Sequence, residues 1–414
     1  MRAFLTKYGI WLLLPALALT CLLFLPTGGH SGDLQHWLLW TRWMTDHGVG
    51  AAYKFGQLVE TDYGCNYPPV YLYLLRGFGL FVQNFDALAE QREWFKLIPF
   101  AFDLAAVFLV WQFLREQRLG VSRIFLLVLN PVFWYDSLIW GQVDALLTTL
   151  VAATLIVALW GHWKTAVILF VLTLNTKLQA IVYLPVVFLT LMPQLRSWRN
   201  IGWVAVLSLL TQAVLLLPFL LAGTLSEWYY TITGLVDQYR NVSLFADNFW
   251  HLVLPEKHAA LYAKDHQPFW FGLTYKTWGL GLFLLSGGLA LLPLAVRVGL
   301  QKVDLKNSDF RAMVLLTATL CTLVFFYFNT QMHERYTHPA ILLSFFFGAL
   351  RRSYWIYGLV SLAFFLNVER VLGYFELYYH TLIFQEVFVA GVYLLAIILA
   401  FWELYRGGWK GLRF

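Results

Sequence analysis

The chain of 414 residues is 60% hydrophobic and 18% aromatic, and only 13% of its residues are charged. Soluble domains carry about 25% charged residues, so this composition excludes an ordinary soluble protein. Several apolar stretches approach or exceed the roughly 20 residues that cross a bilayer as a helix. The net charge of +6 does not indicate a nucleic-acid partner, because membrane proteins collect basic residues at one face. We predict a single polytopic, all-α membrane domain over residues 1–414.

Hydropathy predicts about 12 transmembrane helices, within a range of about 11–13. The first span follows a short basic stretch and lacks the features of a cleaved signal peptide, so we expect it to be retained with the N-terminus in the cytoplasm. The predicted spans cover residues 8–26, 94–114, 121–136, 143–160, 163–176, 178–193, 201–222, 274–296, 311–329, 338–350, 353–368 and 382–405.

Residues 68–83 are also apolar, and the distribution of charge decides their place. If 68–83 lies on the membrane, the loops on one side hold 17 basic and 4 acidic residues. Cytoplasmic loops are rich in Lys and Arg, so we assign this side to the cytoplasm. Counting 68–83 as a span would invert every later loop. We therefore predict an external interfacial helix at 68–83 and two large external segments, 27–93 and 223–273.

A second interfacial helix is predicted in the first external segment. The stretch that begins at Asp33 contains Trp37, Trp40 and Trp43. Tryptophan is typical of helices that lie in the interface, and we expect these side chains to lie in the headgroup layer.

Polar residues gather on the side predicted to be external. Charged side chains at membrane depth are costly unless they are paired or line a wet cavity, so we expect one external cavity to collect them. The clusters are Gly32–Asp33, Asp62–Pro69, Asp136 with Trp140–Asp144, Asn175–Gln179, Asp247–Trp250 and His333–Arg335.

The residue types in these clusters favour chemistry on a lipid phosphate. Lys177, His333 and Arg335 can bind a phosphate through charge-assisted hydrogen bonds, beside apolar helices that suit a lipid tail. Asp33 can act as a general base on a hydroxyl. The Trp, Tyr and Asn side chains of the clusters suit a sugar.

Each candidate also has a structural alternative. Asp33 can be the N-cap of a helix that begins at Leu34, and Lys177 can snorkel from a helix end. His333, Glu334 and Arg335 can satisfy one another as an ion pair. Asp103, within a predicted span, is read as a buried structural group.

In this order, the motifs resemble the GT-C superfamily of polytopic glycosyltransferases. The likeness is to the dolichyl-phosphate-glucose glucosyltransferases of the N-glycan pathway and to related bacterial polyprenyl-phosphate-sugar transferases. The segments that resemble family motifs are Gly32–Asp33, Asn66–Pro69, Gly141–Gln142, Asn175–Gln179, Asp247–Trp250 and His333–Arg335. Two positions depart from the pattern: Asn66 stands where the family has Asp, and Arg335 stands where it has Lys.

The resemblance implies an inverting transferase with Asp33 as general base. It would move a monosaccharide from a polyprenyl-phosphate sugar to a glycolipid, glycan or protein acceptor on the extracytoplasmic face. No metal is required, although a divalent cation serves other branches. The implied substrate-binding residues are Lys177, Gln179, His333, Glu334, Arg335, Asp62, Asn66, Tyr67, Gln142, Asp144, Asn248 and Trp250.

Two other functions remain open. A lipid-linked sugar flippase or transporter would need polar residues on both sides of the membrane midplane, and a protein mannosyltransferase of the same fold would differ in its acceptor. We expect the protein in a prokaryotic plasma membrane, or in the endoplasmic reticulum of a eukaryote.

Overall fold

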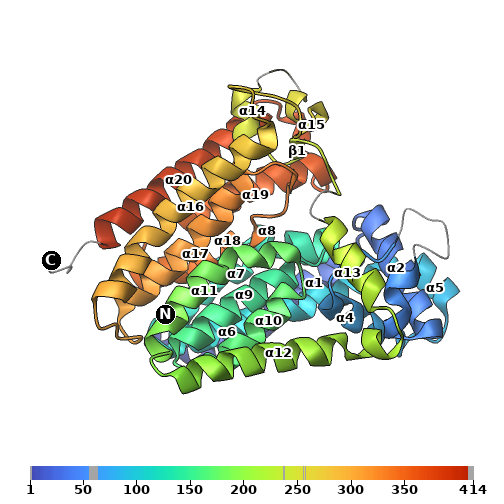
Figure 1. Cartoon of the computed structure of the whole chain (residues 1–414), viewed down its shortest axis with the longest axis horizontal. Coiled ribbons are helices and arrows are strands. Elements are labelled where there is room, and N and C mark those ends of the chain that lie inside the picture. The colour runs from blue at the N-terminus through green and yellow to red at the C-terminus, as the bar shows by residue number, and fades with distance from the viewer. Residues whose placement is uncertain (1, 56–63, 236–237, 255, 257, 409–414) are drawn as a thin grey trace.

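The computed structural model describes residues 2–55, 64–235, 238–254, 256 and 258–408 (Figure 1). Nearly all of its regular structure is helical. Six helices are long and apolar enough to cross a bilayer, which indicates a membrane protein. These six are Arg92–Glu116, Trp198–Leu221, Tyr275–Leu300, Ser308–Phe328, Trp355–Leu372 and Glu386–Gly407. Shorter apolar helices are Leu13–Phe24, Asp144–Leu159, Trp163–Leu174, Leu178–Gln194 and His338–Arg351.

The elements follow one another in the chain as two helical groups. The first group contains α1 (Arg2–Phe24), α2 (Ser31–His47), η1 (Val49–Lys54), α4 (Pro69–Gly79), α5 (Phe85–Glu90), η2 (Arg92–Lys96), α6 (Leu97–Glu116), η3 (Val121–Ile124), α7 (Phe125–Val128), α8 (Pro131–Trp134), η4 (Tyr135–Trp140), α9 (Asp144–Leu159), α10 (Trp163–Leu174), η5 (Leu178–Tyr183), α11 (Leu184–Leu191), η6 (Met192–Gln194) and α12 (Trp198–Leu221). The second contains α13 (Leu225–Gly234), β1 (Ser243–Leu244), α14 (Phe249–Val253), α15 (Ala259–Tyr262), α16 (Tyr275–Leu300), α17 (Ser308–Phe328), β2 (Met332–His333), α18 (His338–Arg351), α19 (Trp355–Leu372), η8 (Leu377–Tyr379) and α20 (Glu386–Gly408).

The core forms where α9, α17 and α18 meet. Helix α17 packs against α16, α18 and α20, while α9 packs against α6, α10 and α18. The apolar window of α17 is 94% buried, whereas that of α12, at the outer edge in Figure 1, is only 11% buried. An apolar helix that is exposed along its length suits contact with lipid chains. In Figure 1, α2, α4 and α5 gather at one end, near α13.

The predicted span 121–136 is not a continuous helix. Short helical pieces replace it: η3, α7, α8 and the π-helical turn η4. Pro131 explains one break, because it lacks the backbone N–H that a continuing helix requires. It stands in the first turn of α8, directly after the N-cap residue Asn130. Turns of the π type are rare and are frequent at functional sites.

Helices form at both predicted interfacial segments, as α2 and α4, but the expected place of two tryptophans was wrong. Trp37 and Trp40 are only 1% and 2% exposed and therefore pack inside the protein. Trp37 Nε1 donates to Gly141 O at 3.1 Å, and its ring meets Tyr71 edge-on with centroids 4.8 Å apart. A buried indole needs such a partner for its N–H, and Gly141, the residue after the π-helical turn, supplies one.

Candidate active site

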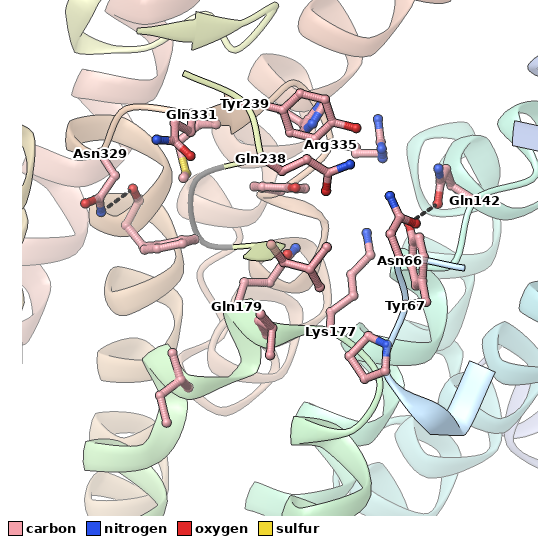
Figure 2. Close-up of a pocket in the computed structure, with 18 of the residues that line it drawn as sticks. Asn66, Tyr67, Gln142, Lys177, Gln179, Gln238, Tyr239, Asn329, Gln331 and Arg335 are labelled. Carbon is pink, nitrogen blue, oxygen red and sulfur yellow. Dashed lines mark hydrogen bonds between the residues drawn. The ribbon is translucent and has the colours of Figure 1, made fainter. Parts of the chain in front are cut away.

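A cavity of about 490 Å³ is lined by residues of α2, of the segment before α4 and of the start of α16. Figure 2 shows that its walls come from segments far apart in the sequence. Residues 66 and 67 precede α4, 142 follows η4, 177 and 179 follow α10, and 329–336 join α17 to α18. The cavity therefore collects five of the six polar clusters that the sequence singles out. Asp136 itself is buried without lining it.

Asp33 lies in the first turn of α2, where a carboxylate is stabilised by the positive end of the helix dipole. Trp140 Nε1 donates to its Oδ2 at 2.8 Å, and His30 Nδ1 lies 2.9 Å from the same oxygen. The backbone N–H of His30 donates to the backbone oxygen of Trp140 at 2.9 Å, and this hydrogen bond ties the start of α2 to η4. These contacts hold Asp33 at the cavity wall, with its side chain 19% exposed.

The protonation of this pair follows from its contacts. His30 Nδ1 also lies 3.2 Å from Asp33 N, which would require it to accept a hydrogen bond. We assign an Nδ1–H that donates to the carboxylate, because this contact is the shorter of the two; the hydrogen bond raises the pKa of His30. Burial opposes ionisation of Asp33, but the hydrogen bond from His30 and the charge of Arg335 outweigh it. The pKa of Asp33 therefore lies well below its usual value, and the carboxylate is ionised at neutral pH.

Lys177 is placed by the end of α10. The chain becomes extended at Lys177 before η5 begins, so its side chain reaches the start of α9. There Nζ donates to Asp144 Oδ1 at 2.7 Å, with the two side chains 7% and 0% exposed. Nζ also lies 5.8 Å from the ring centroid of Tyr67 and 5.4 Å from that of Tyr336. The hydrogen bond to Asp144 uses one of the three N–H groups of the ammonium, so others can serve a ligand.

Arg335 is the second cation of the cavity and is partly buried, with its side chain 11% exposed. Its Nη1 donates to Glu334 Oε1, its Nε lies 3.4 Å from Asp144 Oδ2, and its guanidinium stacks 5.5 Å from the ring centroid of Trp140. Nε makes no hydrogen bond within the described ranges. Burial would raise the pKa of Glu334, but Arg335 and His333 outweigh it and lower this pKa to about 2. The pair therefore stays ionised at physiological pH.

Amide side chains fill the wall between these charges. Gln142 Oε1 accepts from Tyr67 OH at 3.3 Å and from Val143 N at 2.9 Å, which leaves its NH₂ as a donor toward the cavity. Gln179 Nε2 is buried and, in the part of the chain that the structure describes, has no hydrogen-bond partner. Asn66 lies beside Tyr67 at the same wall (Figure 2). Buried polar groups without partners are rare in native proteins, so this wall is suited to a polar ligand.

One side of the cavity is apolar. Leu178, Ile181, Leu280 and Phe325 line it. Ile181 is 54% exposed and Leu280 48% exposed, and apolar residues along α11 and α16 continue the same exposed surface. Helices α11 and α16 pack against each other. The polar cavity is therefore continuous with a surface that suits hydrocarbon chains.

The structure answers the alternatives for the charged residues. The N-cap interpretation of Asp33 is wrong, because α2 begins at Ser31 with His30 as its cap. Lys177 does not snorkel, since it is buried and paired. Within His333–Arg335, Glu334 contacts both neighbours, but Arg335 Nε has no hydrogen bond in the described part of the chain, so the three side chains satisfy one another only in part. Asp103 is buried as expected and accepts a hydrogen bond from Ser137.

Two predicted site residues lie apart from the cavity. Asn248 Nδ2 donates to Phe326 O at 3.0 Å, and Trp250 Nε1 donates to Phe328 O at 3.0 Å. Both side chains are buried and fasten the start of α14 to the end of α17. Asp144 and Glu334 contact the cavity cations from behind without lining it. Asp62 lies outside the described residues.

Several lining residues escaped the sequence analysis. His36 and Trp37 lie three and four positions after Asp33, and this spacing brings them to one face of a helix. That signal was available. The contributions of Tyr239 and Lys276 carried no such signal, because they reach the cavity only through the tertiary fold.

No cluster of three or more His, Cys, Asp or Glu side chains could hold a metal ion within the described ranges. Comparison with models of known protein families and with characterised protein sequences found no match.

Proposed function

We propose that this protein is an inverting membrane glycosyltransferase that uses a polyprenyl-phosphate sugar as donor. The observation that carries the proposal is a cavity that joins an ionised carboxylate, Asp33, to two cations, the buried Lys177 and the partly buried Arg335. A carboxylate suits removal of a proton from an acceptor hydroxyl, and the cations suit a phosphate. The carboxylate alone, or the two cations alone, would not favour a transferase over a binding protein.

The donor fits the cavity by its three chemical parts. The apolar side at Ile181 and Leu280 suits the polyprenyl chain, which can remain in lipid. Lys177 and Arg335 suit the phosphate at the end of that chain. The amide wall with Gln142, together with Trp37, suits a sugar ring, which is bound by hydrogen bonds and by contact with aromatic faces.

In the proposed reaction, the acceptor oxygen forms a bond to the anomeric carbon of the sugar while the bond from that carbon to the phosphate oxygen breaks. The polyprenyl phosphate leaves with the bonding electrons, and Lys177 and Arg335 stabilise the charge that it gains. Asp33 takes the proton of the acceptor hydroxyl. Its low pKa is compatible with this role, because the hydroxyl becomes strongly acidic as the new bond forms.

The proposal includes a GT-C type of architecture with about 12 spans. The five shorter apolar helices, added to the six long ones, bring the number of candidate spans close to this value. The basic residues support an extracytoplasmic cavity. Arg311 and Arg351 lie at the ends of α17 and α18 that are remote from the cavity, and basic residues are typical of the cytoplasmic side.

The sidedness has its own test. In a cysteine-free variant, a cysteine at position 86, where the side chain is 87% exposed, should react with an impermeant thiol reagent added to intact cells. A cysteine at position 118 should not. Labelling of position 118 alone would place the cavity on the cytoplasmic side.

The activity test uses purified protein in lipid nanodiscs with a panel of radiolabelled polyprenyl-phosphate sugars and extracted membrane lipids as acceptors. We expect release of polyprenyl phosphate and transfer of label from one donor, both lost in Asp33→Asn. Mass analysis of the product separates a glycolipid from a protein acceptor. If proteoliposomes instead move intact labelled donor across the bilayer and no sugar leaves the lipid, the protein is a transporter.

A further inference from the structure

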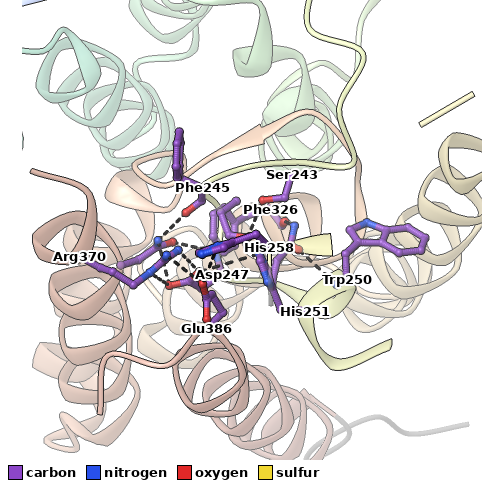
Figure 3. A network of polar contacts seen from close by, with 12 residues as sticks. Ser243, Phe245, Asp247, Trp250, His251, His258, Phe326, Arg370 and Glu386 are labelled. Atoms are coloured by element: carbon purple, nitrogen blue, oxygen red, sulfur yellow. Dashed lines mark hydrogen bonds and ion pairs between the residues drawn. The ribbon is translucent and has the colours of Figure 1, made fainter. Parts of the chain in front are cut away.

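A second polar cluster lies outside the cavity, where the segment after β1 meets α19 and α20 (Figure 3). Asp247 is completely buried, and Arg370 at the last turn of α19 donates to both of its carboxylate oxygens; the distance from Nε to Oδ2 is 3.0 Å. On its other side, Arg370 Nη1 donates to Glu386 at the start of α20, at 3.3 Å. We call Asp247, Asn367 and Arg370 the Asp247 clamp.

Asn367 extends the clamp to the backbone. Its Nδ2 donates to Phe245 O at 2.7 Å, and its Oδ1 accepts from Asp247 N at 3.1 Å. Phe245 has a φ of 63°, a left-handed conformation that a bulky residue rarely adopts and that surrounding contacts must hold. The segment 245–247 is therefore fixed to α19 through both its side chain and its backbone.

This segment continues directly into the cavity wall. Strand β1 pairs in parallel with β2, with Ser243 opposite Met332 and Leu244 opposite His333. A strand pair of two residues is too short to hold its own position. Its place depends on what holds each strand: β2 lies between α17 and α18 in the chain, whereas β1 contacts α15 on one side and continues on the other into residues 245–247, which the clamp holds. His333 and Arg335, which line the cavity, lie on or next to β2.

We propose that Arg370 is a positioning residue for the phosphate-binding end of the cavity, acting through Asp247 and β1 on the backbone that carries His333 and Arg335. The importance of this role for catalysis rests on the proposed function. The planar guanidinium matches both carboxylate oxygens at once, and Lys lacks this geometry. A buried ion pair of this kind adds little net stability but is specific in its geometry.

Another set of contacts competes for the same role. Asn248 and Trp250 tie the start of α14 to α17 through their hydrogen bonds to Phe326 O and Phe328 O. If these bonds alone position β1, then Arg370 is dispensable for the cavity. The test therefore has to separate a local effect on β2 from a general loss of stability.

The experiment compares Arg370→Ala, Arg370→Lys and the control Arg351→Ala, which breaks an arginine–aspartate pair with Asp309 far from the cavity. The full chain is placed in nanodiscs, and amide hydrogen exchange is followed for residues 329–338 and for α17. Binding of undecaprenyl phosphate is titrated in the same samples. We expect Arg370→Ala to speed exchange in 329–338 at least tenfold with α17 unchanged, and to weaken undecaprenyl phosphate binding at least fivefold. In Arg370→Lys, the exchange rate of 329–338 and the affinity for undecaprenyl phosphate should lie between those of Arg370→Ala and the wild type. In Arg351→Ala, both should equal the wild-type values.

Two results would overturn the positioning role. One is unchanged exchange and binding in a folded Arg370→Ala protein, and the other is equally faster exchange throughout the chain. If Arg370→Ala does not fold, the shape-conserving Asp247→Asn variant is read by the same criteria. Arg335→Ala decides the proposed function separately. If Arg335→Ala binds undecaprenyl phosphate as the wild type does, the proposed phosphate site is wrong. Faster exchange of 329–338 in Arg370→Ala would still support the positioning role of the clamp in that case.

Discussion

The cavity and the Asp247 clamp are built from the same chemical parts and differ in how completely those parts are paired. In the clamp, both oxygens of Asp247 accept hydrogen bonds, and Arg370 is shared with Glu386. The neighbouring His251 Nε2, 4.0 Å from Asp247 Oδ1, makes no hydrogen bond in the described part of the chain, but it does not line the cavity. At the cavity, Lys177 donates one hydrogen bond to Asp144, while Gln179 Nε2 and Arg335 Nε have none within the described ranges.

This difference shows how to tell a structural network from a binding site. Buried polar groups are normally satisfied, so groups that lack partners and face a cavity point to a ligand that supplies them. Side chains that satisfy one another, as Asp247, Asn367 and Arg370 do, point to a structural role. Four predictions test this distinction, beginning with the largest expected effect.

Asp33→Asn should lower the turnover of the proposed transferase by about 10²–10⁴-fold. Asparagine keeps the shape of the side chain and can accept from Trp140 Nε1, but it cannot take up a proton at neutral pH. Folding and donor binding should therefore survive, which melting curves and a donor titration measure. Asp62→Asn is the control. Near-normal turnover in Asp33→Asn together with its loss in Asp62→Asn would move the base to Asp62.

Lys177→Ala should weaken binding of a polyprenyl-phosphate donor by about 2–5 kcal/mol, because a desolvated charge contact is lost and the buried Asp144 keeps only Arg335 as a cationic neighbour. Arg335→Ala should act in the same direction, and a charge reversal at either position should be worse. Titration with undecaprenyl phosphate measures the loss. Unchanged affinity in Lys177→Ala would mean that its pair with Asp144 is purely structural.

Asn248→Ala should affect stability and leave the cavity alone. The variant loses the hydrogen bond to Phe326 O and the cap on α14, which together are worth about 1–2 kcal/mol. Its melting temperature should fall while donor affinity stays at the wild-type value. Weaker donor binding without a change in melting temperature would instead return Asn248 to the binding site.

The fourth prediction uses the pH dependence of stability. Burial raises the pKa of Asp247 to about 7 despite the neighbouring Arg370, whereas an unfolded Asp titrates near 4. Between these values the folded chain binds a proton that the unfolded chain does not, so the free energy of unfolding contributed by Asp247 rises as the pH falls from 8 to 5. The wild type should gain about 2–4 °C in melting temperature over Asp247→Asn across this range. If the melting temperatures of the wild type and Asp247→Asn change by the same amount between pH 8 and pH 5, the pKa of Asp247 is not raised.

Much of the candidate site was accessible from the sequence, for a local reason. Asp33, Lys177 and Arg335 each stand in a short polar cluster at the end of an apolar stretch. Charged side chains at membrane depth are costly, so such clusters indicate a functional site. The distribution of basic residues then assigned these clusters to one side. The structure brings all three residues to a single cavity.

The same reasoning misplaced residues whose environment depends on distant contacts. Trp37 and Trp40 belong to a stretch with the composition of an interfacial helix, but both are buried, and Trp37 contacts Gly141 O and Tyr71. Asn248 and Trp250 sit in a family-like motif, yet they fasten α14 to α17 away from the cavity.

The sequence by itself determined that this is a helical membrane protein with polar clusters at the ends of its apolar helices, because hydropathy and charge are properties of neighbouring residues. Only the tertiary structure decided which clusters share a cavity and which side chains become partners. Asp247 and Arg370 are 123 residues apart in the chain and meet because α19 packs beside the segment after β1. Such pairing depends on the packing of whole helices, and no local pattern encodes it.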